Sequence, residues 1–111
     1  MPKNQENQMD ARIVGVHRVQ AEESVYLIEL LIPDETAFDW GEVTQEDPTQ
    51  PRENWQVAYD EQPVPGRPGY YAFFLHYLDL SKPLFTPAGK MAIPAPTSLP
   101  AHLSGIRYES P

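Results

Sequence analysis

Three histidines, His17, His76 and His102, are the side chains best suited to metal binding or proton transfer in this chain of 111 residues. Metal motifs place their ligands at close and regular spacing, and no pair of these histidines has such spacing. His17 and His76 would meet only across neighbouring strands, with Asp79 nearby. We therefore expect histidines at the rim of a sheet, an exposed His102, and neither a metal nor a cofactor.

Carboxylates flank a tryptophan in the run Asp39-Trp40-Gly41-Glu42. An aromatic face beside acidic groups can hold a cationic ligand or the side chain of a lysine or arginine. The alternative is that Trp40 and Trp55 are anchors of the core, because large aromatic side chains dominate burial. The candidate partner-binding residues are Asp39, Trp40, Glu42, Asp47, Trp55 and Asp60.

No spacing in the sequence matches a known catalytic arrangement. The serines lie in no nucleophile elbow, and there is no glycine-rich phosphate loop. Residues 34–47 lack the acid spacing and the central glycine of a calcium loop. Paired carboxylates of the glycosidase kind carry little information in a chain with 16 acidic residues. We therefore expect a protein that is not an enzyme.

Acidic residues are concentrated in the middle of the chain. The formal net charge is −8, and residues 20–62 hold twelve acidic residues against one basic residue, Arg52. This charge argues against binding to nucleic acid or to an anionic membrane surface. It favours encounter with a basic protein partner, whereas the alternative is an acidic surface that only keeps the protein soluble.

The elements that would position these residues are built around Tyr70–Leu80, the densest aromatic and apolar run in the chain. Glycine and proline interrupt the chain on both sides of it, and tyrosine and phenylalanine favour strands. Alternate residues would make both faces apolar, so the strand should be covered on both sides or lie at a subunit contact. The second possibility predicts a homodimer.

Further strands are predicted on either side of the acidic segment. Ala11–Gln20 and Val25–Ile32 should form a hairpin, although a short buried helix is the alternative for Val25–Ile32. Asn54–Gln62 alternates cleanly and should pair with Tyr70–Leu80 in a second hairpin. Pro33–Pro51 is expected to be a long surface excursion, with a short strand near residues 40–45 as the alternative.

The C-terminal part is broken by prolines, which make up 13 of the 111 residues. Residues 84–93 should form an edge strand at best. Ser98–Gly105 has a capping serine, an early proline and a closing glycine, which predict a helix of one or two turns. Residues 1–10 are polar and are expected to be a disordered tail.

These elements predict one domain over residues 11–111, mainly β. It would be a small antiparallel sandwich or a partly open barrel with one short C-terminal helix. The absence of cysteine, of a signal peptide and of a long apolar run leads us to expect a cytoplasmic protein.

Two functions follow from this reading of the sequence. The first is a non-enzymatic interaction module, of an inhibitor or immunity type, whose acidic, tryptophan-containing face binds a basic protein. The alternative is a small-molecule-binding barrel or an enzyme accessory subunit with an aromatic pocket. Its pocket would be lined by Trp55, Tyr71, Phe73, His76 and Tyr77.

Overall fold

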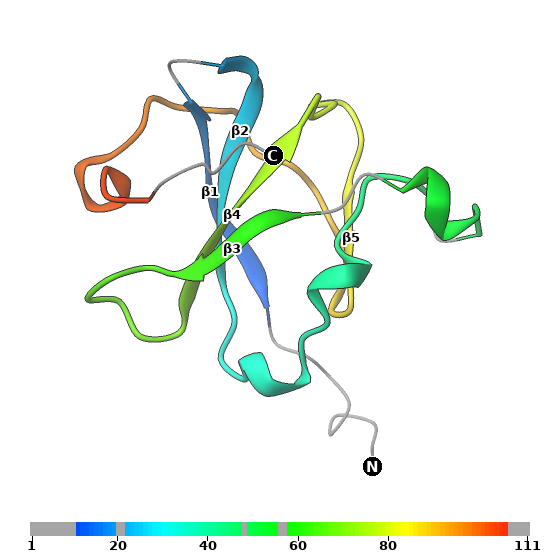
Figure 1. Cartoon of the computed structure of the whole chain (residues 1–111), viewed down its shortest axis with the longest axis horizontal. Helices are drawn as coiled ribbons and strands as arrows, with labels where there is room; N and C mark the ends of the chain where they lie inside the picture. The colour runs from blue at the N-terminus through cyan, green and yellow to red at the C-terminus, as the bar shows by residue number, and fades with distance from the viewer. Residues whose placement is uncertain (1–10, 20–21, 48, 56–57, 107–111) are drawn as a thin grey trace.

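Four antiparallel strands form the central sheet, in the order β1-β2-β4-β3 (Figure 1), and two more form a separate small sheet. The computed structural model describes residues 11–19, 22–47, 49–55 and 58–106. The strands are β1 (Arg12–Val19), β2 (Glu22–Leu31), β3 (Tyr59–Pro63), β4 (Tyr70–His76), β5 (Leu84–Thr86) and β6 (Gly89–Met91). The tail predicted over residues 1–10 lies outside the described residues.

The hairpin predicted near the N-terminus is confirmed as the antiparallel pair β1–β2. Val25–Ile32 is almost entirely strand, so the helical alternative is wrong. Its β-branched residues suit the extended backbone, and hydrogen bonds from strands on both sides hold it there. The strand begins at Glu22, three residues earlier than the sequence predicted.

The aromatic strand β4 is an inner strand of the sheet, between β2 and β3. It ends at His76, so the predicted end at Leu80 is wrong. The reason lies at the next residue: Tyr77 has a φ of 52°, which takes the chain out of the extended conformation and breaks the alternation of faces.

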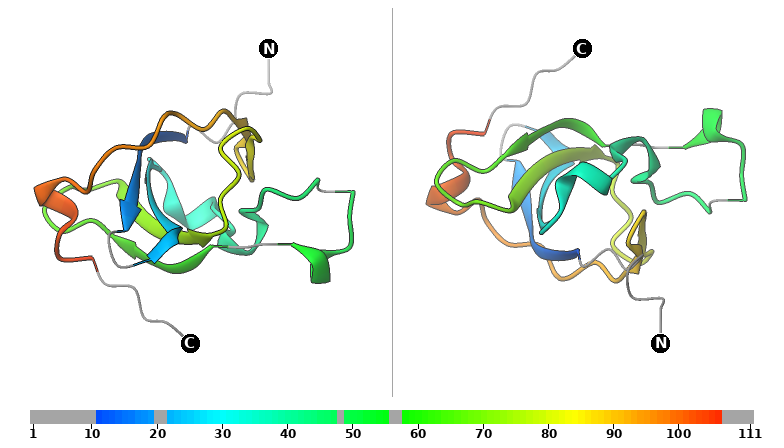
Figure 2. Two further views of the ribbon diagram at one scale, coloured as in Figure 1. Left: turned by 90° about the horizontal axis from the view of Figure 1, so that it is seen from above. Right: turned by 90° about the horizontal axis from the view of Figure 1, so that it is seen from below.

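Each face of the sheet carries its own hydrophobic core. Other segments of the chain lie over the sheet on both sides (Figure 2). The first core consists of Val16, Ile28, Leu30, Ile32, Phe38, Val43, Phe73, Leu75, Leu78 and Leu84. The second consists of Val25, Leu27, Val64, Ala72, Phe74 and Leu103. The prediction that the aromatic strand is covered on both faces is confirmed, and segments of the same chain supply both covers. The homodimer stays a prediction. The aromatic strand no longer supports it, because both of its faces are already covered.

Strand β3 pairs with β4, which confirms the second predicted hairpin. The predicted start of this strand at Asn54 is wrong, because Arg52–Asn54 forms a 3₁₀ turn, η4. The described strand β3 starts at Tyr59. Asp60 has a φ of 55° and coincides with an irregularity in the ladder, so β3 is short and bulged.

The acidic segment Pro33–Pro51 is an excursion with buried anchor points. It contains two 3₁₀ turns, η2 (Glu35–Ala37) and η3 (Trp40–Glu42). Val43, Thr44 and Gln45 are buried, and Thr44 pairs with Phe85 of β5 by two backbone hydrogen bonds. The strand considered near residues 40–45 is therefore reduced to a single β-bridge.

The described residues are mainly β and antiparallel, as predicted, and they form no closed barrel. The predicted C-terminal helix is a single 3₁₀ turn, η5 (Ala101–Leu103). Within the described part of the chain, none of the helical turns is long and apolar enough to traverse a bilayer.

Candidate functional site

In the run Asp39-Trp40-Gly41-Glu42, the last three residues form the turn η3 and Asp39 is its N-cap. The carboxylate of Asp39 accepts a hydrogen bond from the Gly41 amide at 2.9 Å and caps the turn. Trp40 is half-buried against the first core, with ring centroids of Phe38 and Phe73 at 4.9 and 5.5 Å. Trp40 therefore packs against the first core with part of its ring, and its role in partner binding stays a prediction.

Trp55 follows the turn η4 and is only partly buried. Its indole N–H donates to the Gln50 carbonyl oxygen at 3.0 Å. The guanidinium carbon of Arg52 lies 4.8 Å from the centre of the ring, and Arg52 also donates to the Gly41 carbonyl oxygen. The Trp55 ring thus already takes part in a cation–π contact within the chain.

A cleft lies between this acidic region and the β5–β6 hairpin, with a volume of about 360 Å³. We call it the Trp55 cleft. Its lining residues are Glu42, Thr44, Trp55, Phe85, Thr86, Gly89 and Lys90. Two of the six predicted partner-binding residues, Glu42 and Trp55, are therefore brought together in one concave surface.

The other three predicted acidic residues, Asp39, Asp47 and Asp60, do not line this cleft. Asp47 is exposed, and hydrogen bonds from the backbone and side chain of Thr49 hold the pKa of its carboxyl below the ordinary value of 3.8. Asp60 lies in the bulge of β3. Neither residue lines the Trp55 cleft.

The five residues of the alternative aromatic pocket do not share a surface. Phe73 is fully buried in the first core, and Tyr71 packs against that core. Tyr77 is 74% exposed, and its ring lies beside that of His76 at the end of β4. The predicted pocket is therefore not assembled, because Tyr77 leaves the strand through its positive φ.

The structure does not bring His17 and His76 together. His17 faces Leu27 in the β1–β2 ladder, whereas His76 faces Val25 in the β2–β4 ladder. Asp79 lies in the turn after β4, where hydrogen bonds from Ser81 lower the pKa of its carboxyl. Among the described residues, no group of three or more histidine, cysteine or acidic side chains has a geometry that could hold a metal ion.

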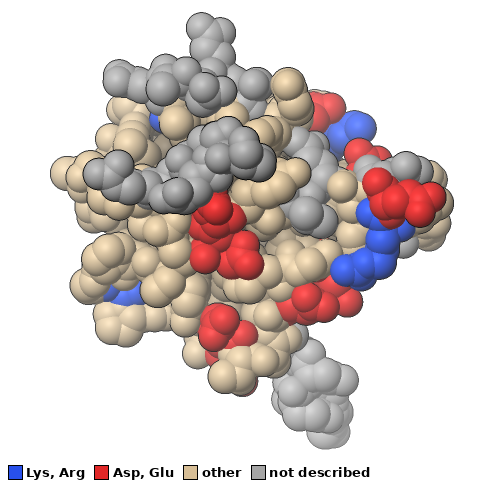
Figure 3. Space-filling view, in the orientation of Figure 1, with Lys and Arg blue, Asp and Glu red and all other residues tan. Residues whose placement is uncertain are grey.

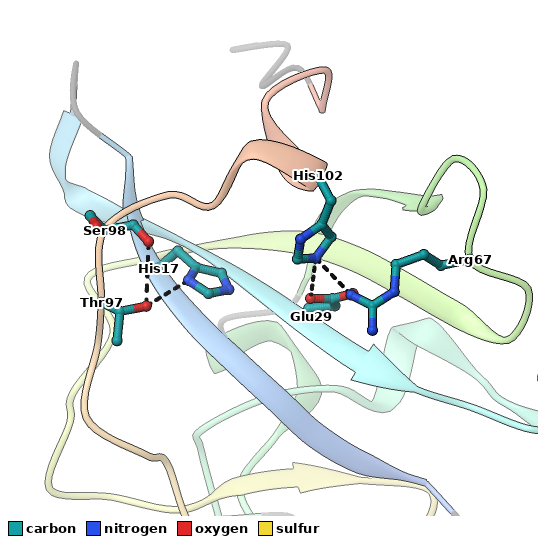
Figure 4. Close-up of polar contacts among 6 residues, drawn as sticks. All are labelled: His17, Glu29, Arg67, Thr97, Ser98 and His102. Carbon is teal, nitrogen blue, oxygen red and sulfur yellow. Dashed lines mark hydrogen bonds and ion pairs between the residues drawn. The ribbon is translucent and has the colours of Figure 1, made fainter.

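A polar cluster that the sequence did not predict lies on the face of the second core (Figure 4). At its centre is Glu29 of β2, whose side chain is 3% exposed. One carboxylate oxygen accepts from Arg67 Nη1 at 3.1 Å, and the other lies 3.1 Å from His102 Nε2. Arg67 and His102 come from the β3–β4 loop and from η5, so the contact joins three separate segments. We call these residues, with His17, the Glu29 cluster.

The neighbours of Glu29 in the sheet explain why a carboxylate fits there. Gly15 of β1 and Ala72 of β4 are its partners in the two ladders. Both are small, so neither fills the space over the sheet beside the carboxylate. The guanidinium of Arg67 also stacks on the ring of Tyr70, with 4.0 Å between its carbon and the ring centre.

His17 completes the cluster on the β1 side. Its Nδ1 lies 2.9 Å from the hydroxyl of Thr97, and its Nε2 is buried without a hydrogen-bond partner among the described residues. Burial lowers the pKa of His17 from the ordinary value of 6.5, although the negative charge of Glu29 acts in the opposite direction. His17 is therefore held in its neutral form.

One signal for this cluster was present in the sequence. Glu29 is the single charged residue within the apolar run Val25–Ile32. A buried charge requires a partner, but Arg67 and His102 are 38 and 73 residues away. Only the register of the strands and the path of the C-terminal segment reveal them.

Comparison with protein families, with curated proteins and with solved structures gives no match for this chain. The function must therefore be argued from the geometry alone.

Proposed function

We propose that this protein is a non-enzymatic interaction module that binds a basic side chain of a partner protein in the Trp55 cleft. The observation that supports this proposal is the combination of an aromatic ring and a carboxylate, Trp55 and Glu42, on the walls of one cleft. An aromatic face with a nearby carboxylate is the arrangement that recognises a lysine or arginine side chain.

The surrounding charge favours the same kind of partner. Acidic side chains gather at the centre of the face in Figure 3, and at its right side acidic and basic side chains lie next to one another. Such a field raises the rate of encounter with a cationic partner and is screened by salt. The long-range attraction would come from the surface, and the specific contact from the cleft.

The opposite wall of the cleft limits which sequences would fit. Lys90 of β6 lines it, beside Phe85 and Thr86 of β5. A second cation next to the bound one would meet the Lys90 ammonium, which is unfavourable. We therefore propose a preference for a single basic residue followed by a neutral or acidic residue. In this proposal the β5–β6 hairpin acts as the second layer of a small sandwich.

The experiment is a binding titration with fluorescein-labelled peptides that differ at one central position: arginine, lysine or glutamine. Binding of the arginine and lysine peptides should weaken as salt is raised, and the glutamine peptide should bind poorly. Glu42→Gln should weaken binding at least tenfold. Glu61→Gln is the matched control, because it removes the same charge from β3, outside the cleft.

Two results would overturn the proposal. One is salt-independent binding of all three peptides with equal affinity. The other is an equal loss of affinity in Glu42→Gln and Glu61→Gln, which would assign the attraction to net charge alone.

A small-molecule function is the second candidate, because a cleft of about 360 Å³ falls in the size range of ligand pockets. A comparison of ligands in the same titration distinguishes the two candidate functions. A compact aromatic cation that binds as tightly as the arginine peptide would favour a small ligand, whereas a large gain from the flanking peptide residues would favour a protein partner.

A further inference from the structure

The C-terminal segment 97–106 crosses the face of the sheet that carries the second core, and we call it the strap (Figure 4). It is attached at two places. Near its start, Thr97 pairs with β1 through two backbone hydrogen bonds, to Val16 and Arg18, of 2.9 and 3.0 Å. Further along, Leu103 is buried in the second core and His102 contacts Glu29.

Both attachments involve a histidine. At the first, His17 of the sheet bonds to Thr97 of the strap. At the second, His102 of the strap bonds to Glu29 of the sheet. A histidine can change its charge and its hydrogen-bonding capacity near neutral pH, so the contact between His17 and Thr97 can respond to a proton.

The hydrogen bonds around Thr97 favour one neutral form of His17 in the closed state. The Thr97 hydroxyl donates to the Ser98 carbonyl oxygen at 3.4 Å, and the Thr97 oxygen can then accept from the Nδ1–H of His17 at 2.9 Å. The lone pair is then on Nε2, which is buried and has no partner among the described residues. A proton added at Nε2 would have no hydrogen-bond acceptor in place and little water to solvate it.

We propose that the strap is a pH-sensitive latch, closed while His17 is neutral and released when His17 takes up a proton. Release would expose Nε2 to water, which solvates the imidazolium. The lowered pKa of His17 in the closed state agrees with this direction: the open state binds the proton more readily. The inference is independent of the function proposed for the Trp55 cleft.

Other titratable or charged groups also act on His17. From β2, Glu29 favours the protonated form and opposes release. From the strap, His102 disfavours it, and from the β3–β4 loop, Arg67 lies 2.8 Å from His102 Nε2. Because Arg67 can only donate, His102 Nε2 either accepts from Arg67 or donates to Glu29.

The experiment measures amide hydrogen exchange by NMR on the full chain between pH 7.5 and 5.5. The Thr97 and Arg18 amides, which bond across the strap and β1, report release. The Phe73 amide in the buried inner strand reports global unfolding. Below pH 6.5, protection of Thr97 and Arg18 should fall by up to about tenfold per pH unit, the limit for one linked proton. Protection of Phe73 should not change.

Variants assign the effect to one histidine. His17→Asn keeps a polar group near Thr97 but does not titrate, so the pH dependence should disappear. In His102→Gln it should persist. Unchanged protection of Thr97 across the pH range in the natural chain, or an unchanged pH dependence in His17→Asn, would overturn the proposal.

If His17→Asn does not fold, the imidazole ¹⁵N shifts of His17 in the natural chain decide the question. Protonation only at Nδ1 at neutral pH, and titration together with the loss of Thr97 protection, would support the latch. A His17 that is protonated at Nε2 at neutral pH, or that titrates while Thr97 stays protected, would refute it.

Discussion

The imidazole of His17 occupies the space that a side chain at Gly15 would need. A Cβ atom built on Gly15 would lie 2.6 Å from His17 Nε2 and 2.9 Å from His17 Cε1. Non-bonded heavy atoms do not approach so closely, so the ring and a larger residue 15 exclude each other. Residue 15 must therefore be glycine as long as the His17 ring keeps this position.

Gly15→Ala should destabilise the protein by about 1–3 kcal/mol, because the added methyl group must displace the His17 ring and its bond to Thr97. The measurement is urea unfolding followed by circular dichroism. Gly105→Ala is the control, since a Cβ there meets no atom within 4 Å. Equal stability of Gly15→Ala and the natural chain would show that the ring moves aside at no cost.

Arg67→Met should destabilise the protein by about 2–3 kcal/mol, a value between those of exposed and fully buried ion pairs. The variant leaves the 3%-exposed Glu29 carboxylate with His102 as its remaining side-chain hydrogen-bond partner among the described residues. In a Glu29→Gln background the same replacement should cost much less, since the buried charge is gone. Urea unfolding of the two single variants and the double variant measures this coupling, and strictly additive effects would contradict it.

The two tryptophans should respond oppositely to replacement. Trp40→Ala should cost about 3 kcal/mol of stability, because its ring packs on Phe38 and Phe73 in the first core. Trp55→Ala should cost about 1 kcal/mol or less, and should abolish binding of the arginine peptide. Thermal unfolding and the peptide titration test the pair. If Trp40→Ala is as stable as the natural chain but no longer binds the arginine peptide, Trp40 belongs to the partner-binding surface and not to the core.

Gln45→Ala should destabilise the protein by about 2–3 kcal/mol, since it leaves buried backbone groups unpaired. The Gln45 side chain accepts from the Asp79 amide at 2.8 Å and donates to the carbonyl oxygens of Asp79 and Lys82. It thereby fixes the turn after β4 to the acidic segment. Gln62→Ala is the control, because that amide donates to Asp60, only two residues away. Comparable unfolding midpoints for the two variants would contradict this role.

The strands were predictable where a local pattern determines the structure. Val25–Ile32 and the start of β4 carry enough β-branched and aromatic residues to be recognised from the sequence. The end of β4 was not predictable, since a positive φ at a tyrosine has no sequence signal. The turn η4 was not predictable either. The alternation of residues after Asn54 suggested a strand that starts at Asn54, but Asn54 is the last residue of this turn.

The candidate sites were less predictable because they depend on contacts between distant segments. Glu42 and Trp55 were singled out from their residue types, but Phe85 and Lys90, on the other wall of the cleft, were not. Trp40 could not be told from Trp55 by sequence, since both stand among polar residues and only tertiary packing distinguishes them.

The strap also affects how this protein would meet copies of itself. β1 is an outer strand of the sheet, and Thr97 occupies the outward amide of Arg18 and the outward carbonyl of Val16. Exposed strand edges promote intermolecular β-pairing and aggregation. The segment that covers His17 would thus also protect this edge from intermolecular strand pairing, and its detachment would remove both protections at once.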